Sequence, residues 1–370
     1  MYHLELRDFI LSHDNWEELL TSDPYNLKIS RDEGYIMFKY NQVLSDFSIP
    51  LVREARGIIF RESDWECVCH AFNKFFNEGE KNVADIDWNT ASVQEKVDGS
   101  LIKFWYDKDW HVSTNGTIDA FKAELNDTKY PNFLQLVFAA IHQVFEDEYN
   151  FVDLLDPKCT YMFELVSPYN RVVIPYKEIK LYFLGARNME DGKEYDPKKF
   201  DVSVYFDVPK RYSLHSLEDV QKAANELPWD QEGYVVCDAN FNRVKIKSPQ
   251  YVMAHYARNN GVVNTERLVQ IILDGEQEEF LTYASDYADE LQEVEESMHK
   301  IASDSVDKMK ILFGASYEFS NRGDYARDVM TCPKYMQDFM FHCYDEKIFW
   351  DYAKSWNAKS WVKAINELKG

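Results

Sequence analysis

The chain has 370 residues, 45% of them apolar and 15% aromatic, and its 41 basic and 64 acidic side chains give a formal net charge of −23. This length supports two domains with sizeable cores, and no apolar run approaches the ~20 residues that a membrane-spanning helix needs. Both halves of the chain are acidic, which argues against a uniformly basic polynucleotide-binding module. Contact with a polynucleotide would have to rest on a local basic cleft.

The N-terminal residues lack the charged and then apolar pattern of a secretory signal. Six cysteines in a chain of this length do not indicate a disulfide framework, so we expect a reducing, cytoplasmic location. Cys67, Cys69 and His70 could be read as metal ligands, but no second Cys or His pair follows at a suitable spacing. We therefore favour buried strand positions for these three side chains.

The first predicted element is an amphipathic helix over residues 4–20, which ends at the Ser-Asp-Pro sequence of residues 22–24. Strand signals then dominate the chain to about residue 250. The predicted elements of this part are strands over 35–40, 57–60 and 67–72, a hairpin over 101–113, helices over 121–126 and 133–145, and strands around Glu164, Phe183, Tyr234 and Ile246.

From about Val252 onward the strand signals end and helical periodicity dominates, with an acidic run over residues 274–296. We therefore expect an α+β domain over residues 1–253, built on mainly antiparallel sheets with flanking helices. An all-helical domain should follow over residues 254–370. A small β-barrel would need short strands with turn signals roughly every 8–12 residues, and this tail lacks them.

The tetrapeptide Lys-Val-Asp-Gly at residues 96–99 leads into the strand signal that begins at Ser100. A lysine amine can attack phosphorus where nearby positive charge or desolvation favours its unprotonated form. We expect Gly99 to let the backbone turn without a Cβ clash and Asp98 to bond amides of its own turn. A lysine at a strand edge is the alternative, so the assignment depends on other motifs.

Those motifs are present at ordered positions. They are Arg-Gly-Ile-Ile-Phe at 56–60, Asn-Lys-Phe-Phe-Asn at 73–77, Phe-Glu-Leu-Val at 163–166 with Ser-Pro-Tyr-Asn-Arg-Val-Val after it, Leu-Tyr-Phe-Leu at 181–184, Glu-Gly-Tyr-Val-Val at 232–236 and Val-Lys-Ile-Lys-Ser at 244–248. The series resembles the covalent nucleotidyltransferase superfamily of polynucleotide ligases and RNA capping enzymes. Within it, the motifs resemble the ATP-dependent RNA ligases of the bacteriophage T4 RNA ligase 1 type, over residues 35–251 and more weakly through the tail.

The resemblance implies that Lys96 is the nucleophile that takes AMP from ATP. It also implies that Lys245 and Lys247 contact the α-phosphate. Their spacing of two places both side chains on one face of a strand, where two ammonium groups could clamp a phosphate. A solvated strand edge is the alternative.

Glu164 and Glu232 each lie in an apolar strand segment, where a carboxylate is costly to bury without a cation or a hydrogen-bond donor. The superfamily uses these positions for ribose hydroxyls or a divalent metal, and a structural salt bridge is the alternative. Gly233 is expected to let the nucleotide approach the backbone closely.

The resemblance further implies nucleotide or phosphate contacts for Arg56 and Lys74. Tyr40 matches a nucleotide-contact position, although a tyrosine in an aromatic-rich strand is more often a core residue. Phe76 and Tyr251 match positions important in the family and are candidate RNA contacts, with packing as the alternative.

One departure from the family pattern follows the predicted hairpin. The family has Ser-Lys-Gly-Ser there, whereas this chain has Thr-Asn-Gly-Thr at 114–117, so Asn115 replaces a lysine that contacts a nucleotide or RNA phosphate. Glu278 and Glu279 match acidic positions of the family and form a candidate cation site. A solvated helix face is the alternative for this pair.

The function implied by the resemblance is RNA ligation with ATP and Mg²⁺, for which Mn²⁺ can substitute. The enzyme would join 5′-phosphate and 3′-hydroxyl RNA ends through lysyl-AMP and RNA-adenylate intermediates, in RNA repair with nicked tRNA as the implied substrate. We expect a monomer without a membrane partner, in the host cytoplasm if a phage encodes it. The alternatives are another enzyme of the superfamily, a DNA ligase or a GTP-using capping enzyme, and a catalytically silent RNA-end-binding protein.

Overall fold

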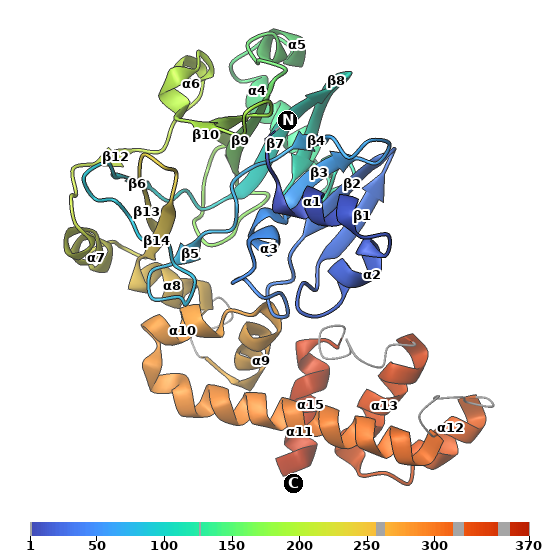
Figure 1. Cartoon of the computed structure of the whole chain (residues 1–370). Helices are drawn as coiled ribbons and strands as arrows, with labels where there is room; N and C mark the ends of the chain where they lie inside the picture. The colour runs from blue at the N-terminus through green and yellow to red at the C-terminus, as the bar shows by residue number, and fades with distance from the viewer. Residues whose placement is uncertain (1, 126, 257–262, 314–321, 347–355, 370) are drawn as a thin grey trace. The chain divides into compact units, whose positions relative to one another are not determined.

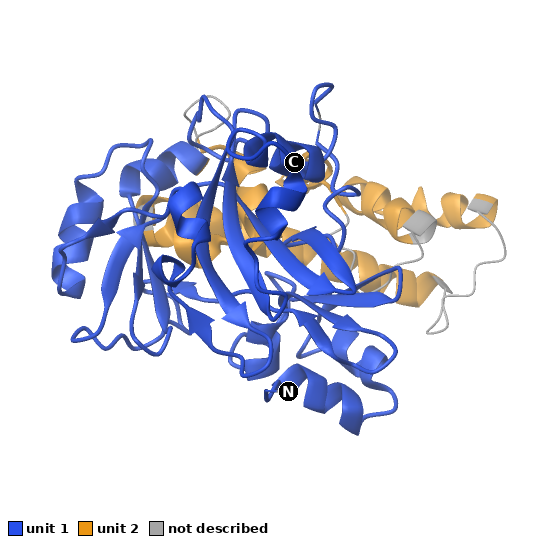
Figure 2. Cartoon of the chain, turned by 90° about the horizontal axis from the view of Figure 1, so that it is seen from above, with its two compact units in different colours: residues 1–255 blue, residues 256–370 orange. Residues whose placement is uncertain are grey.

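The computed structural model describes residues 2–125, 127–256, 263–313, 322–346 and 356–369. The chain divides into two compact units, Met1–His255 and Tyr256–Gly370 (Figure 2). The first unit combines strands and helices. The described part of the second contains helices and no strand (Figure 1).

A four-stranded antiparallel sheet opens the first unit, with strand order β1-β2-β3-β4. One of its faces packs on three short helices through a core that includes Leu6, Phe38 and Phe60. The helix predicted over residues 4–20 is two helices, because the backbone is extended at His13. The elements are α1 (Glu5–Ser12), α2 (Trp16–Thr21), β1 (Lys28–Asp32), β2 (Tyr35–Lys39), α3 (Pro50–Glu54), β3 (Arg56–Arg61) and β4 (Cys67–Cys69).

A second sheet has five antiparallel strands in the order β11-β10-β9-β7-β8. Phe104 and Phe163 on one face pack on helices α4, α5 and α6, and Trp105 on the other face packs against Met37 and Ile59 of the first sheet. The elements are β7 (Ser100–Asp107), β8 (Asp109–Thr114), α4 (Phe133–Ile141), α5 (Glu148–Val152), β9 (Cys159–Val166), β10 (Lys180–Asn188), β11 (Glu194–Tyr195) and α6 (Val202–Tyr205).

The third sheet carries the motif lysines Lys245 and Lys247 on β14, and it has the order β12-β6-β13-β14-β5, antiparallel except for the β14–β5 pair. Val93, Tyr234 and Ile246 on one face form a core with helix α7. The elements are β5 (Phe76–Asn77), β6 (Ser92–Glu95), β12 (Arg211–Tyr212), α7 (Leu217–Asn225), β13 (Gly233–Cys237) and β14 (Arg243–Lys247). The predicted α+β architecture with mainly antiparallel sheets is confirmed.

Three further predicted elements of this unit differ from the structure. The helix predicted over residues 133–145 ends at Ile141. Residues 120–123 form isolated turns instead of a helix. The chain then enters a loop in which the Leu125 amide donates to the Pro131 carbonyl. Asn126 lies outside the described residues. The strand predicted over residues 67–72 ends at Cys69.

The described helices of the second unit form their own apolar core, in which Trp361 lies 5.4 Å from Phe339 between ring centroids. Among the described residues, no helix is both long and apolar enough to cross a membrane. The helices from the end of the first unit onward are α8 (Pro249–Tyr256), α9 (Thr265–Asp274), α10 (Gln277–Tyr283), α11 (Ala288–Phe313), α12 (Arg322–Val329), α13 (Lys334–Glu346) and α15 (Ala358–Lys369).

Gly233 is required by the pairing of β13 with β14. Its φ is +141°, and a Cβ atom there would lie 2.3 Å from the carbonyl oxygen of Ile246. The close approach is therefore between two strands, and it accounts for the glycine without the nucleotide contact that we expected.

We predict that Gly233→Ala lowers the free energy of unfolding by ~3 kcal/mol or more, since left-handed strain of about 1–2 kcal/mol is combined with overpacking of about 1–3 kcal/mol. The control is Gly34→Ala, where φ is +86° but nothing lies within 4 Å of the added atom. Denaturant titration of both variants checks the difference. Equal denaturation midpoints for Gly233→Ala and Gly34→Ala would contradict the steric explanation for Gly233.

Candidate active site

Lys96 lies directly after β6, at the point where this strand pairs with β13. Its backbone amide donates to the Gly233 carbonyl at 2.9 Å, which places the lysine next to Glu232. The Lys96 Nζ lies 2.6 Å from Glu232 Oε1, with side-chain exposures of 21% and 4%. The amine therefore reaches the surface of a cavity while its carboxylate partner stays buried.

Asp98 fixes the loop that carries Lys96. One oxygen, Oδ2, accepts hydrogen bonds from the Val173 and Ile174 amides at 2.9 and 2.8 Å, and Oδ1 accepts one from the Tyr251 hydroxyl at 2.8 Å. We expected Asp98 to bond amides of its own turn. The structure gives it partners 75 to 153 residues away, so the lysine loop is held to a distant loop and to helix α8.

Gly99 allows β7 to lie directly against β9. A Cβ atom at this position would lie 2.4 Å from the Leu165 carbonyl oxygen and 3.0 Å from the Glu164 Cγ. Close strand approach, and not the expected turn, therefore requires the glycine. The same approach brings Glu164 toward the lysine loop.

A cavity of about 670 Å³ opens beside this loop. Its lining includes Lys96, Glu164 and Arg56, and one wall is the loop that contains Asn115. Strands from all three sheets contribute to it, so the cavity depends on the way the sheets pack.

Burial raises the pKa of Glu164 from its ordinary 4.5 to about 7. The Glu232 carboxylate raises this pKa further, whereas the Lys96 and Arg56 cations lower it and offset part of the shift. The cavity therefore holds a carboxyl group that takes up a proton more readily than an ordinary glutamate. A cation bound at this group would favour its charged form.

The two lysines of β14 leave the same side of the strand but have different neighbours. Lys247 Nζ lies 3.7 Å from the same Glu232 oxygen that Lys96 contacts. Lys245 Nζ lies 5.6 Å from the centroid of the Phe75 ring. Arg56 lies over the same ring at 5.2 Å, so both cations lie close to Phe75, which lines the cavity.

Three predicted contact residues gather at a different place. The Lys74 Nζ lies 5.2 Å from the Tyr40 ring and 5.4 Å from the Phe76 ring, and it donates to Gln42 at 3.3 Å. Lys74 and Phe76 line a second cavity of about 360 Å³. The structure therefore brings together Lys96, Arg56, Glu164, Glu232 and Lys247, and it places Lys74, Tyr40 and Phe76 in a separate cluster.

The candidate RNA contacts Phe76 and Tyr251 are buried, with 6% and 3% exposure. Phe76 packs on Phe47, and Tyr251 donates to Asp98. These surroundings favour the packing alternative for both residues.

The remaining candidate ligands lie apart from the cavity. Glu278 is exposed in the first turn of α10, in the second unit. Cys67 and Cys69 are buried strand residues, and His70 bonds Tyr2 and Asn73 through its two ring nitrogens. Within the described ranges, no group of three or more His, Cys, Asp or Glu side chains could hold a metal.

Lys103 is a buried residue that the sequence analysis did not identify. It is fully buried in β7, where its Nζ donates to the Gly57 carbonyl at 2.5 Å. Burial lowers its pKa below the ordinary value. A charged residue inside the apolar run of residues 101–106 was the available signal. Its bond holds the backbone beside Arg56.

We predict that Glu164→Gln changes how stability depends on pH. The raised folded-state pKa means that stability is fully present below about pH 4.5 and is lost as the pH rises through about 7. Glutamine stays neutral, so the wild type should lose ~2 kcal/mol relative to the variant from about pH 5 to pH 8. Urea unfolding with a chelator present measures this difference.

The control for this prediction is Glu146→Gln, at an exposed glutamate for which no such difference is expected. Parallel pH curves for the wild type and Glu164→Gln would show that Glu164 titrates at its ordinary value.

Comparison with known proteins identifies the family. A family model described as RNA ligase matches residues 54–251. The chain is 32% identical over 279 residues to a putative bifunctional polynucleotide kinase/RNA ligase of Autographa californica nuclear polyhedrosis virus, covering 70% of this chain but 39% of that relative. It is 23% identical to an RNA ligase of Rhodothermus phage RM378, with 71% and 72% coverage.

Among solved structures, the match to an archaeal ATP-dependent RNA ligase covers 90% of this chain and 79% of the archaeal chain. The TM-score is 0.47 and the sequence identity is 12%. The family match covers more than half of the 370 residues and includes the lysine loop and the residues that line its cavity. The chain belongs to the RNA ligase family.

Proposed function

We propose that this protein is an ATP-dependent RNA ligase that joins a 5′-phosphate to a 3′-hydroxyl through lysyl-AMP and RNA-adenylate intermediates. The observation that carries the proposal is the position of the Lys96 amine, at the wall of a 670 Å³ cavity and 2.6 Å from a buried carboxylate. This volume is in the range of small-molecule sites. Arg56 and Lys247 supply positive charge nearby.

In the first step, Lys96 Nζ attacks the α-phosphorus of ATP. A phosphorus–nitrogen bond forms, the bond from the α-phosphorus to the bridging oxygen breaks, and pyrophosphate leaves. The attacking nitrogen must first give up a proton, and Glu232 Oε1 is within hydrogen-bond reach to accept it. Lys247, which contacts the same oxygen, then compensates the negative charge on the phosphate.

The next two steps transfer and release AMP. An oxygen of the RNA 5′-phosphate attacks the lysyl-AMP phosphorus, a pyrophosphate linkage forms, and the Lys96 nitrogen leaves with a proton. The 3′-hydroxyl of the second RNA end then attacks the activated 5′-phosphate, a phosphodiester forms and AMP leaves. Catalysis of this kind rests on positioning and on charge stabilisation.

The carboxylates of the site fit a bound Mg²⁺. Glu232 Oε2 is buried and has no hydrogen-bond partner in the described part of the chain, and Glu164 lines the same cavity as Lys96. Mg²⁺ typically takes one or two carboxylates and fills its remaining positions with phosphate oxygens and water. Glu164 and Glu232 would hold it, and Mn²⁺ could replace it. When bound, the ion would neutralise charge that develops on the phosphates.

The proposed substrate is RNA with a 5′-phosphate and a 3′-hydroxyl, with nicked tRNA as the natural candidate. The name of the viral relative pairs RNA ligase with polynucleotide kinase, an activity that would supply a 5′-phosphate. We assign RNA specificity to the helical region over residues 254–370, which would take the place of the β-barrel of DNA ligases and capping enzymes. The helices with their own apolar core support this assignment.

We predict that Lys96→Ala abolishes the covalent protein–AMP adduct and that Lys96→Arg does not restore it, because a guanidinium stays protonated and is a poor nucleophile. Incubation with α-labelled ATP or GTP and Mg²⁺, followed by a denaturing gel, measures the adduct. Labelling by ATP alone separates a ligase from a capping enzyme, and no labelling indicates a silent RNA-binding protein. An undiminished adduct in Lys96→Ala would refute the assignment.

Lys247→Ala and Lys245→Ala should each lower the rate of adduct formation by ~10²-fold, the scale for loss of one preorganised charge. Single-turnover labelling at saturating ATP gives the rate. Lys108→Ala, at an exposed turn lysine, is the control with the same change of charge. If both variants form the adduct at rates within twofold of the control, Lys245 and Lys247 do not clamp the phosphate, and the alternative role at a strand edge is favoured.

A further inference from the structure

The second cavity, of about 360 Å³, is lined by four cationic side chains in a chain whose net charge is −23. These are Arg53, Lys74, Arg187 and Arg243. Arg243 and Phe75 also line the cavity of Lys96, so the two cavities are neighbours. A local excess of positive charge next to a phosphoryl-transfer site is the electrostatic pattern of a phosphate-binding site.

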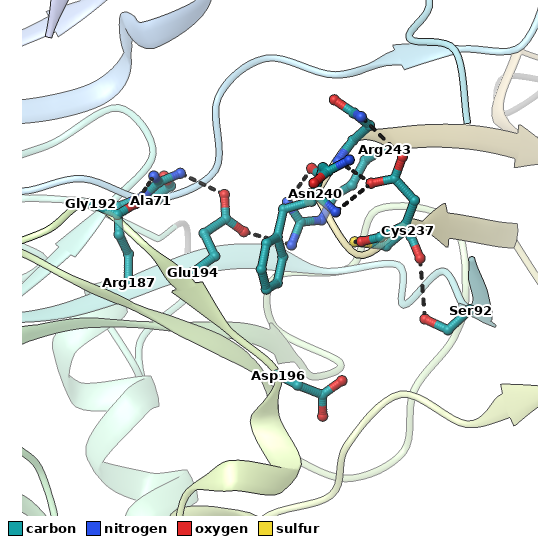
Figure 3. A network of polar contacts seen from close by, with 12 residues as sticks. Ala71, Ser92, Arg187, Gly192, Glu194, Asp196, Cys237, Asn240 and Arg243 are labelled. Carbon is teal, nitrogen blue, oxygen red and sulfur yellow. Dashed lines mark hydrogen bonds and ion pairs between the residues drawn. The ribbon is translucent and has the colours of Figure 1, made fainter. Parts of the chain in front are cut away.

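The two carboxylates of this cavity do not cancel its charge. Glu54 accepts hydrogen bonds from the Glu5 and Leu6 amides at 3.1 and 2.9 Å, so backbone donors and not the cations of the cavity are its partners. Glu194 lies between two guanidinium groups, 2.5 Å from Arg187 and 2.6 Å from Arg243 (Figure 3). One carboxylate shared by two arginines leaves a net positive charge.

Both arginines are fixed in place before any ligand arrives. Arg187 donates to the Ala71 and Gly192 carbonyls at 3.1 and 2.7 Å (Figure 3). Arg243 lies over the Phe72 ring at 4.3 Å and donates to the Phe241 carbonyl at 3.2 Å. Charges that are positioned in advance bind an anion without further ordering of side chains.

Arg53 is, with Lys74, a partly exposed cation of this group. Its carbonyl accepts from the Lys74 amide at 2.8 Å, which holds the two residues side by side. Its side chain is partly exposed and forms no ion pair with the residues that the structure describes. Because Lys74 already lies against the Tyr40 and Phe76 rings, Arg53 is the better placed of the two to contact a phosphate.

The rest of the lining suits a nucleotide better than a small anion. The amide side chains of Asn82 and Asn240 offer donors and acceptors, and the partly exposed rings of Phe75 and Phe241 supply aromatic surface. Cations that bind the backbone, together with aromatic rings, are the combination found in sites for single-stranded nucleic acid.

We propose that this second cavity binds a phosphate of the RNA strand, close to the end that is joined. The inference rests on the proposed RNA-ligase function and adds a site for the polynucleotide beside the ATP cavity. The triphosphate tail of ATP carries the same chemistry, so the test has to separate the two sources of phosphate.

The test compares Arg53→Gln with the charge-preserving Arg53→Lys and with Lys28→Gln, an exposed lysine of β1 outside both cavities. Fluorescence anisotropy of a short 5′-phosphorylated RNA is measured over a range of salt concentrations. We expect Arg53→Gln to weaken binding ~10-fold and to reduce the slope of log K against log salt by ~0.7, the value for one phosphate contact on a single strand. Arg53→Lys should retain most of the slope, and Lys28→Gln all of it.

Formation of lysyl-AMP from ATP alone is measured on the same variants. An unchanged adduct rate in Arg53→Gln together with a reduced salt slope supports the RNA site. A reduced adduct rate with unchanged RNA binding assigns the cavity to the ATP tail and overturns the proposal, as does no effect in either assay. If the wild type forms no adduct, the proposed function fails, whereas the salt slopes still test this cavity independently.

Discussion

The ion pair between Lys96 and Glu232 is the interaction on which the arrangement of the site depends. A carboxylate as buried as Glu232 requires a cation close by, and the 2.6 Å contact supplies one. The pair forms because β6 and β13 are neighbours in the third sheet, which places the end of one strand beside the start of the other. Pairing of the strands therefore determines where the nucleophile lies.

This ion pair has a consequence for reactivity. An ammonium is not a nucleophile, so attack on phosphorus requires that a proton of Lys96 first move to an acceptor. Lys247 contacts the same Glu232 oxygen, at 3.7 Å. In the proposed mechanism, Glu232 takes the proton of Lys96, and the positive charge of Lys247 then compensates the negative charge on the phosphate.

The loop of Lys96 is held by distant parts of the chain. Asp98 joins it to residues 173–174 and to Tyr251 in α8, while Gly99 lets β7 pack against β9. The segments that meet at the cavity thus come from most of the first unit. This explains why the family motifs extend over some 200 residues, as the matched range 54–251 indicates.

Much of this architecture could be predicted from the sequence. Because side chains alternate between the two faces of a strand, the sequence predicts that Lys245 and Lys247 share one face. Because a buried carboxylate is costly, it also identifies Glu164 and Glu232 as candidate site residues. The partners of Asp98 could not be predicted, because hydrogen bonds to residues 75 and 153 positions away leave no local pattern. For the same reason the sequence did not show that Lys74 lies with Tyr40 and Phe76, away from Lys96.

The break of the first helix at His13 and the turns at residues 120–123 were missed for a related reason. Apolar spacing predicts a helical face, but it does not show whether the backbone continues through it.

The central claim is that AMP passes through the protein to an RNA end before the ends are joined. A chase experiment tests it most directly: protein labelled with AMP is freed of ATP and mixed with RNA that carries a 5′-phosphate and a 3′-hydroxyl. The account predicts that the label moves from protein to RNA and then to free AMP as joined RNA appears. Label that stays on the protein, or joined RNA that appears without a labelled RNA intermediate, would contradict it.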